Sequence, residues 1–214
     1  IDIHTHILPP GWEDWAARYG VTGWPSCRLH DACNATIYLG EKEFRKIDDR
    51  SFAPARRIAD MDAENIGLQL LSPVPVMLCY WGPPEATDAF ARMQNDFIAG
   101  VVQKHPGRFA PAGTVALQDT QLAVRELERL KSMGFAAVEI GSHVNGRDFD
   151  DPALFDFFAA AQSLDLPLFV HPQGPSVGQD RLGQYYLPFM VGYPADSALA
   201  AARLILGGVL ARLP

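Results

Sequence analysis

Two histidines close to the start of the chain, His4 and His6, have the residue type and the spacing of metal ligands. They end the apolar segment IDIHTH, which is predicted to be a short buried strand. Side chains at positions i and i+2 of a strand share one face, so the two imidazoles project together while Thr5 points the other way. Neutral imidazole is a good ligand for Zn²⁺, whereas burying two imidazoles without partners is costly. The pair therefore predicts a metal site rather than a packing role.

Two further histidines end apolar segments. His171 ends the strand-like part of LPLFVHP and is a candidate for a third metal-bound nitrogen. His143 ends FAAVEIGSH and is predicted to contact substrate, to support the site or to bond only to backbone. A hydrolytic or lyase zinc site usually adds a carboxylate and leaves a position open for water. No Asp or Glu closes a predicted strand, so we expect the missing ligands to lie beyond Pro214.

Apolar and amphipathic segments alternate from residue 53 onward, which is typical of βα units that build a parallel sheet. Polar residues gather where the strands end, as they do at the binding face of a doubly wound sheet or of a (β/α)8 barrel cut short after its fifth unit. The predicted strands are residues 1–6, 68–75, 109–117, 135–144 and 166–172. The predicted helices are residues 54–67, 87–108, 120–134, 151–165 and 196–213.

Residues 7–53 interrupt this alternation and are predicted to be an insertion between the first strand and the first helix. Within them, the segment ATIYLGEKEFRKI is typical of a β-hairpin that turns near Gly40 and Glu41. No internal repeat and no low-complexity tract divides the chain. We therefore expect residues 1–214 to form a single α/β domain that carries this insertion.

The composition narrows the partners and the compartment. The chain has 214 residues, of which 48% are hydrophobic and 20% charged, and its net charge of −7 comes without a basic patch, so no nucleic-acid partner is expected. No stretch approaches the ~20 apolar residues of a membrane helix, so no membrane partner is expected. The three cysteines form no CxxC pair, which favours a reducing, cytoplasmic location. The chain shows no GxGxxG after a strand and no P-loop.

Four segments together resemble the aminocarboxymuconate-semialdehyde decarboxylases of the amidohydrolase superfamily. The resemblance runs along nearly all of the chain and weakens across residues 11–52. The His-x-His pair alone is shared by the whole superfamily, whereas SPVP, EIGSHVN and FVHP are more specific. The segments that carry the resemblance are IDIHTHILP, MDAENIGLQLLSPVPVMLCYW, the run from GFAAVEIGSHVNG to LPLFVHP, and YYLPFMVGYPADSALAAARLILGGVLARLP.

The resemblance implies a (β/α)8 TIM-type barrel, of which about the first five βα units are present, with one divalent metal, usually Zn²⁺, on His4, His6 and His171. It implies a homodimer and a non-oxidative decarboxylation of a small unsaturated dicarboxylic acid such as 2-amino-3-carboxymuconate 6-semialdehyde. It also implies a proton-shuttle histidine on the sixth strand and an aspartate ligand on the eighth. Neither has a counterpart in this sequence, so the catalytic acid–base group is expected beyond Pro214.

The resemblance further implies an arginine that binds the substrate carboxylate, and the matching position is Arg45 in EFRKI. A guanidinium holds a carboxylate through two parallel hydrogen bonds, which suits a decarboxylase, while the alternative is a surface charge on the hairpin. Trp81, His143 and Tyr186 are the other predicted substrate-binding residues. Aromatic residues in such loops line a pocket or serve only as lid or core.

Other functions stay open at this point. The same metal ligands serve aromatic-acid decarboxylases, hydratases and hydrolases of ring esters or lactones within the superfamily. An alternative of a different class is that the chain is an inactive fragment that keeps only the interaction surface of the barrel. Bound metal in the purified protein would argue against this last reading.

Overall fold

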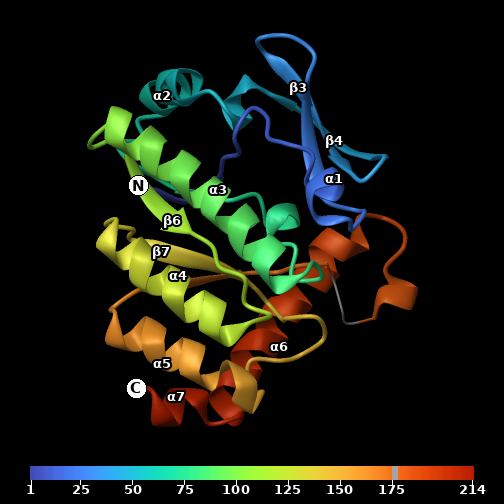
Figure 1. Ribbon diagram of the computed structural model, residues 1–214, viewed down its shortest axis with the longest axis vertical. Coiled ribbons are helices and arrows are strands. Elements are labelled where there is room, and N and C mark those ends of the chain that lie inside the picture. The colour runs from blue at the N-terminus through green and yellow to red at the C-terminus, as the bar shows by residue number, and fades with distance from the viewer. Residues whose placement is uncertain (175–177) are drawn as a thin grey trace.

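A five-stranded parallel sheet forms the centre of the molecule, with strand order β1-β5-β6-β7-β8 (Figure 1). The computed structural model describes residues 1–174 and 178–214. The sheet curls strongly, because the ring of His6 on one edge strand lies 5.1 Å from the ring of His171 on the other. The predicted α/β class and the five parallel strands are confirmed, as part of a barrel. The strands are β1 Asp2–His6, β5 Gln69–Ser72, β6 Phe109–Gly113, β7 Ala137–Gly141 and β8 Leu168–His171.

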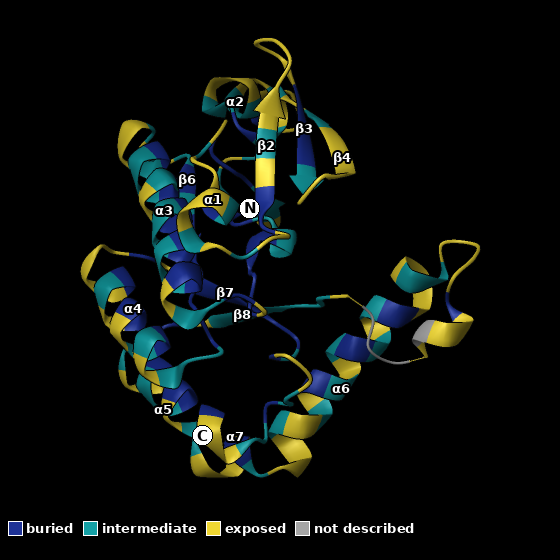
Figure 2. Cartoon of the chain, turned by 45° about the vertical axis from the view of Figure 1, so that its right-hand side comes forward, coloured by how far each residue is buried: buried dark blue, intermediate teal, exposed yellow. Residues whose placement is uncertain are grey.

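Amphipathic helices connect the parallel strands and cover the outer face of the sheet, and buried residues run along them (Figure 2). In α4, Leu127 and Leu130 are fully buried, and the helix begins where the Asp119 side chain accepts a hydrogen bond from the Leu122 backbone N–H. These helices are α2 Pro54–Ala63, α3 Pro84–Lys104, α4 Thr120–Ser132 and α5 Phe155–Ser163. Short helical turns are η1 Asp49–Ser51, η2 Pro75–Met77, η3 Pro152–Leu154 and η4 Gln179–Arg181.

The first strand is not buried, which corrects the prediction made from its apolar residues. Ile1 and Ile3 are 87% and 62% exposed. The reason is the position of β1 at the edge of the sheet, where it pairs only with β5. In contrast, β7 lies inside the sheet and all five of its residues are buried. A continuous apolar run is a reliable sign of burial only for strands that are covered on both faces.

A separate three-stranded antiparallel sheet, β2-β3-β4, lies beside the parallel one. Strands β3 and β4 form a hairpin around Gly40 and Glu41, where the sequence predicts one. Strand β2 and helix α1 were not predicted, because PSCRL has no alternation of apolar residues and WAARY is only five residues long. The bounds are α1 Trp15–Tyr19, β2 Pro25–Leu29, β3 Asn34–Leu39 and β4 Lys42–Asp48.

An aromatic cluster anchors this small sheet and α1 to the rest of the fold. Phe90 of α3 is fully buried, with its ring centroid 5.0 Å from that of Trp15 and 5.4 Å from that of Trp24. Trp12 contacts the same phenylalanine at 5.8 Å. These rings form a second hydrophobic core beside the main one under the parallel sheet.

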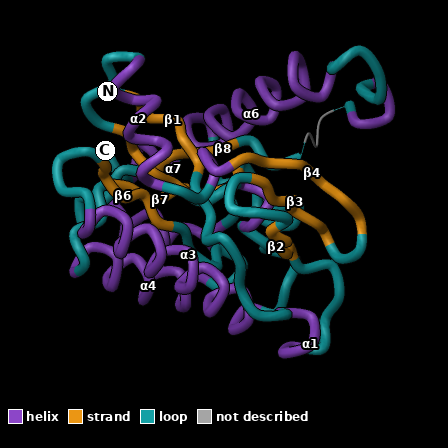
Figure 3. Tube along the Cα trace, turned by 90° about the horizontal axis from the view of Figure 1, so that it is seen from above, coloured by secondary structure: helices purple, strands orange, loops and turns teal. Residues whose placement is uncertain are grey.

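The last predicted helix, residues 196–213, is instead two helices, α6 Tyr193–Leu206 and α7 Val209–Arg212, and the π-helical turn η5 Pro188–Gly192 precedes them. The break follows from Gly207 and Gly208, of which Gly208 has a left-handed φ of 77° that favours glycine. Figure 3 shows α3 and α4 on one side of the parallel strands and α6 on the other.

The segment Pro188–Leu206 is long and apolar enough to cross a membrane by length and composition, with a mean hydropathy of 1.2. The sequence prediction that no stretch approaches that length is therefore wrong, because the apolar run continues past two charged residues. Both charges have places in this fold: Asp196 is buried, and Arg203 forms ion pairs with Asp148 and Asp150. A single helix of this kind is weak evidence for a membrane span.

Candidate metal centre and substrate pocket

Three histidines from the two edge strands meet at one point. His4 and His6 come from β1 and His171 from the end of β8, and each ring centroid lies 5.1–5.2 Å from the other two. One nitrogen of each ring lies within 4.8 Å of the corresponding nitrogens of the other two. These three are the residues that the sequence predicts as metal ligands, and the structure brings all of them together.

Two of these rings are held in the tautomer that suits a metal ligand. The Nδ1 atom of His6 lies 2.8 Å from the carbonyl oxygen of Pro73, and Nδ1 of His171 lies 2.8 Å from that of Pro172. A carbonyl oxygen only accepts hydrogen bonds, so Nδ1 carries the hydrogen in both rings and Nε2 keeps its lone pair. Three imidazoles within reach of one another fit a borderline divalent cation.

Burial favours the neutral form of two of these imidazoles, those of His6 and His171. It lowers the pKa of His6 to about 4, and the neighbouring His171 adds to the effect by electrostatic repulsion. Burial also lowers the pKa of His171, aided by repulsion from His4, while the bond to the Pro172 carbonyl opposes the shift. A histidine must be neutral to bind a metal, so the site is prepared for a cation at neutral pH.

Glu139, a fully buried residue in the middle of β7, is not among the site residues predicted from the sequence. Its Oε2 atom accepts a hydrogen bond from the Ser72 hydroxyl and lies 3.6 Å from Nδ1 of His6. Burial raises the pKa of Glu139 to about 8, although the Ser72 bond lowers it. At neutral pH the contact with His6 is therefore mostly between uncharged groups, not an ion pair. The available signal was a lone acid inside the apolar strand AVEIG.

A cavity of about 570 Å³ opens beside the histidines, within the usual range for a small-molecule site. His6 and His171 line it on the side of the parallel sheet, and Arg45 of β4 lines it on the side of the small sheet. Trp81 is half-exposed and contributes an apolar wall, with its ring 5.0 Å from that of Trp24. Side chains from β1, β4 and β8, which lie far apart in the sequence, thus line one cavity.

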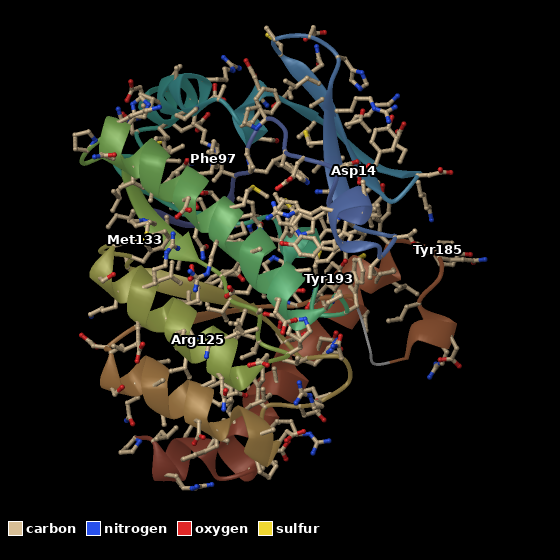
Figure 4. The ribbon with its side chains drawn as sticks, in the orientation of Figure 1. Asp14, Phe97, Arg125, Met133, Tyr185 and Tyr193 are labelled. Atoms are coloured by element: carbon tan, nitrogen blue, oxygen red, sulfur yellow. The ribbon has the colours of Figure 1, made fainter. Side chains whose placement is uncertain are left out.

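The structure places two predicted substrate-binding residues outside this cavity. Tyr186 is 78% exposed and does not line it, because Tyr185 and Tyr186 adopt left-handed φ angles of 56° and 58° in a loop that projects outward. Figure 4 shows Tyr185 at the edge of the molecule. The aromatic residues of this region that do line the cavity are Phe189, which the YYLPF segment contains, and Tyr193, which was not predicted.

His143 is also absent from the cavity wall. It follows β7, and both of its ring nitrogens are buried without a hydrogen-bond partner among the described residues. Of the three alternatives weighed from the sequence, bonding to backbone is the one that the structure contradicts.

Comparison with known proteins agrees with the family that the sequence resembles. The model of the amidohydrolase family matches residues 1–214. The chain is 41% identical over 215 residues to 2-amino-3-carboxymuconate-6-semialdehyde decarboxylase from Dictyostelium discoideum, which confirms the predicted resemblance. The match covers 100% of this chain and 60% of that relative, so the chain spans less than two thirds of the relative's length.

Two solved structures show the same fold. One is 5-carboxyvanillate decarboxylase from Sphingomonas paucimobilis, with a TM-score of 0.70 and 34% identity, covering 74% of this chain and 48% of that one. The other is a mutant 5-carboxyvanillate decarboxylase from Novosphingobium aromaticivorans, with a TM-score of 0.64 and 30% identity over 73% of this chain and 46% of that one. The second structure contains manganese and 3-methoxy-4-hydroxy-5-nitrobenzoic acid.

Proposed function

The chain belongs to the amidohydrolase family, and from that premise we propose that the protein is a metal-dependent, non-oxidative decarboxylase. The proposed substrate is a small unsaturated dicarboxylic acid such as 2-amino-3-carboxymuconate 6-semialdehyde. The observation that carries the proposal is the placement of His6, His171 and Arg45 on one cavity, because it puts a cation site and a carboxylate anchor within one substrate-sized space. The 41% identity to the Dictyostelium decarboxylase supports the choice of substrate.

His4, His6 and His171 are proposed to hold a divalent cation, and we propose zinc because three imidazole nitrogens suit it. Manganese, which the Novosphingobium relative contains, is the competing choice. When bound, such a cation polarises a water molecule or a substrate oxygen. The role of the chain is to bring three imidazole nitrogens together, and the lowered pKa values of His6 and His171 keep two of them unprotonated at neutral pH.

Arg45 is proposed to bind a carboxylate of the substrate. Its guanidinium lies 5.4 Å from the Phe44 ring centroid, at the wall of the cavity opposite the parallel sheet. A fork of N–H donors fixes a carboxylate in two directions, which orients the rest of the molecule. Trp81 is proposed to flank the conjugated chain of the substrate as an apolar wall. The acid–base histidine implied by the resemblance has no counterpart in residues 1–214, so the assigned roles end at binding and orientation.

The partners and the compartment are proposals of the same kind. A homodimer is supported by exposed apolar residues along η5 and α6, among them Met190 at 70% and Leu206 at 86% exposure, since such strips mark contact surfaces. A cytoplasmic location is supported by Cys27, Cys33 and Cys79, which are free. Sedimentation of the purified protein at several concentrations measures the first of these.

Aromatic-acid decarboxylation is the second candidate, since both solved relatives described above are 5-carboxyvanillate decarboxylases. A CO₂-release assay on the complete, metal-loaded protein separates the two. We expect release from 2-amino-3-carboxymuconate 6-semialdehyde and little from 5-carboxyvanillate or 2,6-dihydroxybenzoate. Preference for either benzoate would move the assignment to the aromatic acids. Release from none of the three, with hydrolysis of a lactone instead, would overturn the decarboxylase proposal.

A further inference from the structure

Glu139 is a buried acid for which the fold gives no structural reason. Among the described residues no arginine or lysine pairs with it, and its Oε1 atom has no hydrogen-bond partner. The other fully buried glutamate, Glu126, differs, because it pairs with Arg92 and Arg129 and accepts a hydrogen bond from Asn95. A buried acid without a cation costs free energy that an apolar residue of similar volume avoids. Its position therefore points to a task at the histidine cluster.

A chain of contacts links Glu139 to that cluster. The Ser72 hydroxyl donates to Oε2 of Glu139, and Oγ of Ser72 lies 3.0 Å from Nδ1 of His6. These residues come from β7, β5 and β1, so the chain of contacts crosses the concave face of the sheet over β6.

The intervening strand leaves room for this crossing. A Cβ atom on Gly113 would meet the side chain of Leu130 on the outer helix α4, so Gly113 faces outward. Because side chains alternate along a strand, Ala112 faces inward. Ala112 therefore presents only a methyl group on the inner face of β6. At the same level the Thr114 hydroxyl donates to the backbone carbonyl of Glu139 at 3.0 Å.

We propose that Glu139 is a positioning residue which, through Ser72, holds the imidazole of His6 in the orientation that presents Nε2 to a cation. This inference rests on the cation site proposed above. The Pro73 carbonyl already accepts from Nδ1 of His6 and fixes its tautomer. The Ser72–Glu139 pair adds a second contact at the same nitrogen, which restricts rotation of the ring about its Cβ–Cγ bond. Outer partners of this kind typically change metal affinity by about 10–100-fold.

The test measures the Zn²⁺ dissociation constant of the complete protein by competition with a chromogenic chelator at one pH. Glu139→Leu, which keeps the volume but removes the bond to Ser72, is expected to weaken Zn²⁺ binding by about 10–100-fold. Glu139→Gln, which keeps a hydrogen-bonding group, is expected to stay within about threefold of the parent protein. Thr114→Val is the matched control, since it removes a buried hydroxyl at the same level without touching Ser72, and it is expected to leave the constant unchanged.

The outcomes separate the two proposals. If the parent protein binds no Zn²⁺, the proposed metal site fails before the role of Glu139 is reached. If the parent binds and Glu139→Leu binds equally well, or if Glu139→Gln loses as much as Glu139→Leu, the positioning role is overturned. An equal loss in Thr114→Val would overturn it too, because the effect would then be a general loosening of β7. Should Glu139→Leu fail to fold, Ser72→Ala removes the bridging hydroxyl, and an unchanged constant in that variant would contradict the inference.

Discussion

The imidazole rings of His6 and His171 lie 5.1 Å apart, although the two residues belong to opposite edges of a five-stranded sheet. Only strong curvature of the sheet brings these edges together. The cation site is therefore a property of the curled fold, even though each histidine is placed by its own strand. Substitutions that act on the ligands, on the pocket wall or on the packing beneath them should have separable effects.

Replacing His4 by alanine should abolish stoichiometric zinc in the purified protein, because two imidazoles alone hold the cation far more weakly. Elemental analysis after desalting measures the metal content. His30→Ala is the matched control, since this exposed histidine of the small sheet bonds to Thr36 and stands outside the cluster. One zinc per chain in the His4→Ala protein would remove His4 from the site.

Replacing Arg45 by alanine should raise KM for the dicarboxylic acid by about 10–100-fold, since a hydrogen bond to a charged group contributes about 1.5–3 kcal/mol. The kcat value should change less if the arginine binds ground state and transition state alike. Arg28→Ala is the control, because the Arg28 guanidinium lies over the Tyr38 ring of the same small sheet and not on the cavity. An unchanged KM in Arg45→Ala would refute the carboxylate anchor.

Replacing Phe90 by alanine should lower the free energy of unfolding by about 3–5 kcal/mol, the usual cost of emptying a buried aromatic site. The loss should be accompanied by weaker near-UV circular dichroism, because Trp12, Trp15 and Trp24 all pack on this ring. Urea unfolding measures the difference. Met133→Ala, at a position that is 39% exposed, should cost less than about 1 kcal/mol. Equal losses in the two variants would contradict the packing role of Phe90.

The contribution of His6 to the stability of the metal-free protein should shrink as the pH falls from about 6.5 to about 4. Burial lowers the pKa of His6 to about 4, so in this window the unfolded chain binds a proton that the folded chain does not. The His6 contribution therefore rises with pH there, by at most about 1.4 kcal/mol per pH unit. Glu139, whose pKa burial raises to about 8, contributes in the opposite direction, so the His6 part is read from a comparison with a variant. Urea unfolding in the presence of a chelator measures the slope.

His6→Gln provides the comparison for that slope, because carboxylates elsewhere in the chain contribute equally to both proteins. The slope between pH 4.5 and 6.5 should be shallower in the variant, as expected when a titrating group is removed. Identical slopes in the two proteins would show that His6 stays solvated in the metal-free state.

The sequence predicts the parts of the site that depend on local geometry. His4 and His6 share a face because they lie two residues apart in a strand, and His171 is recognisable because it ends another one. Glu139 was not predicted because the sequence does not tell which face of its strand becomes the concave face of the curled sheet, where the histidines lie. Tyr186 was misplaced because its direction is set by a left-handed turn that no periodicity reveals.

The exposure of the first strand shows the same limit at the level of the fold. Residues 1–6 read as a covered strand, yet Ile3 faces solvent because β1 has a neighbour on one side only. Strand type follows from composition, whereas position within a sheet follows from pairings that are distant in the sequence. For the same reason β2 was not predicted, since it is a strand only through its antiparallel pairing with β3.

In the described part of the chain no strand of the small sheet pairs with the parallel sheet, and Ile37 of β3 packs in the same hydrophobic cluster as Phe90 of α3. The cavity wall that carries Arg45 thus belongs to a sheet separate from the strands that carry the three histidines. Substitutions in β4 can change which acid binds without moving the three imidazoles. Substrate selectivity and metal affinity can therefore evolve independently among related chains.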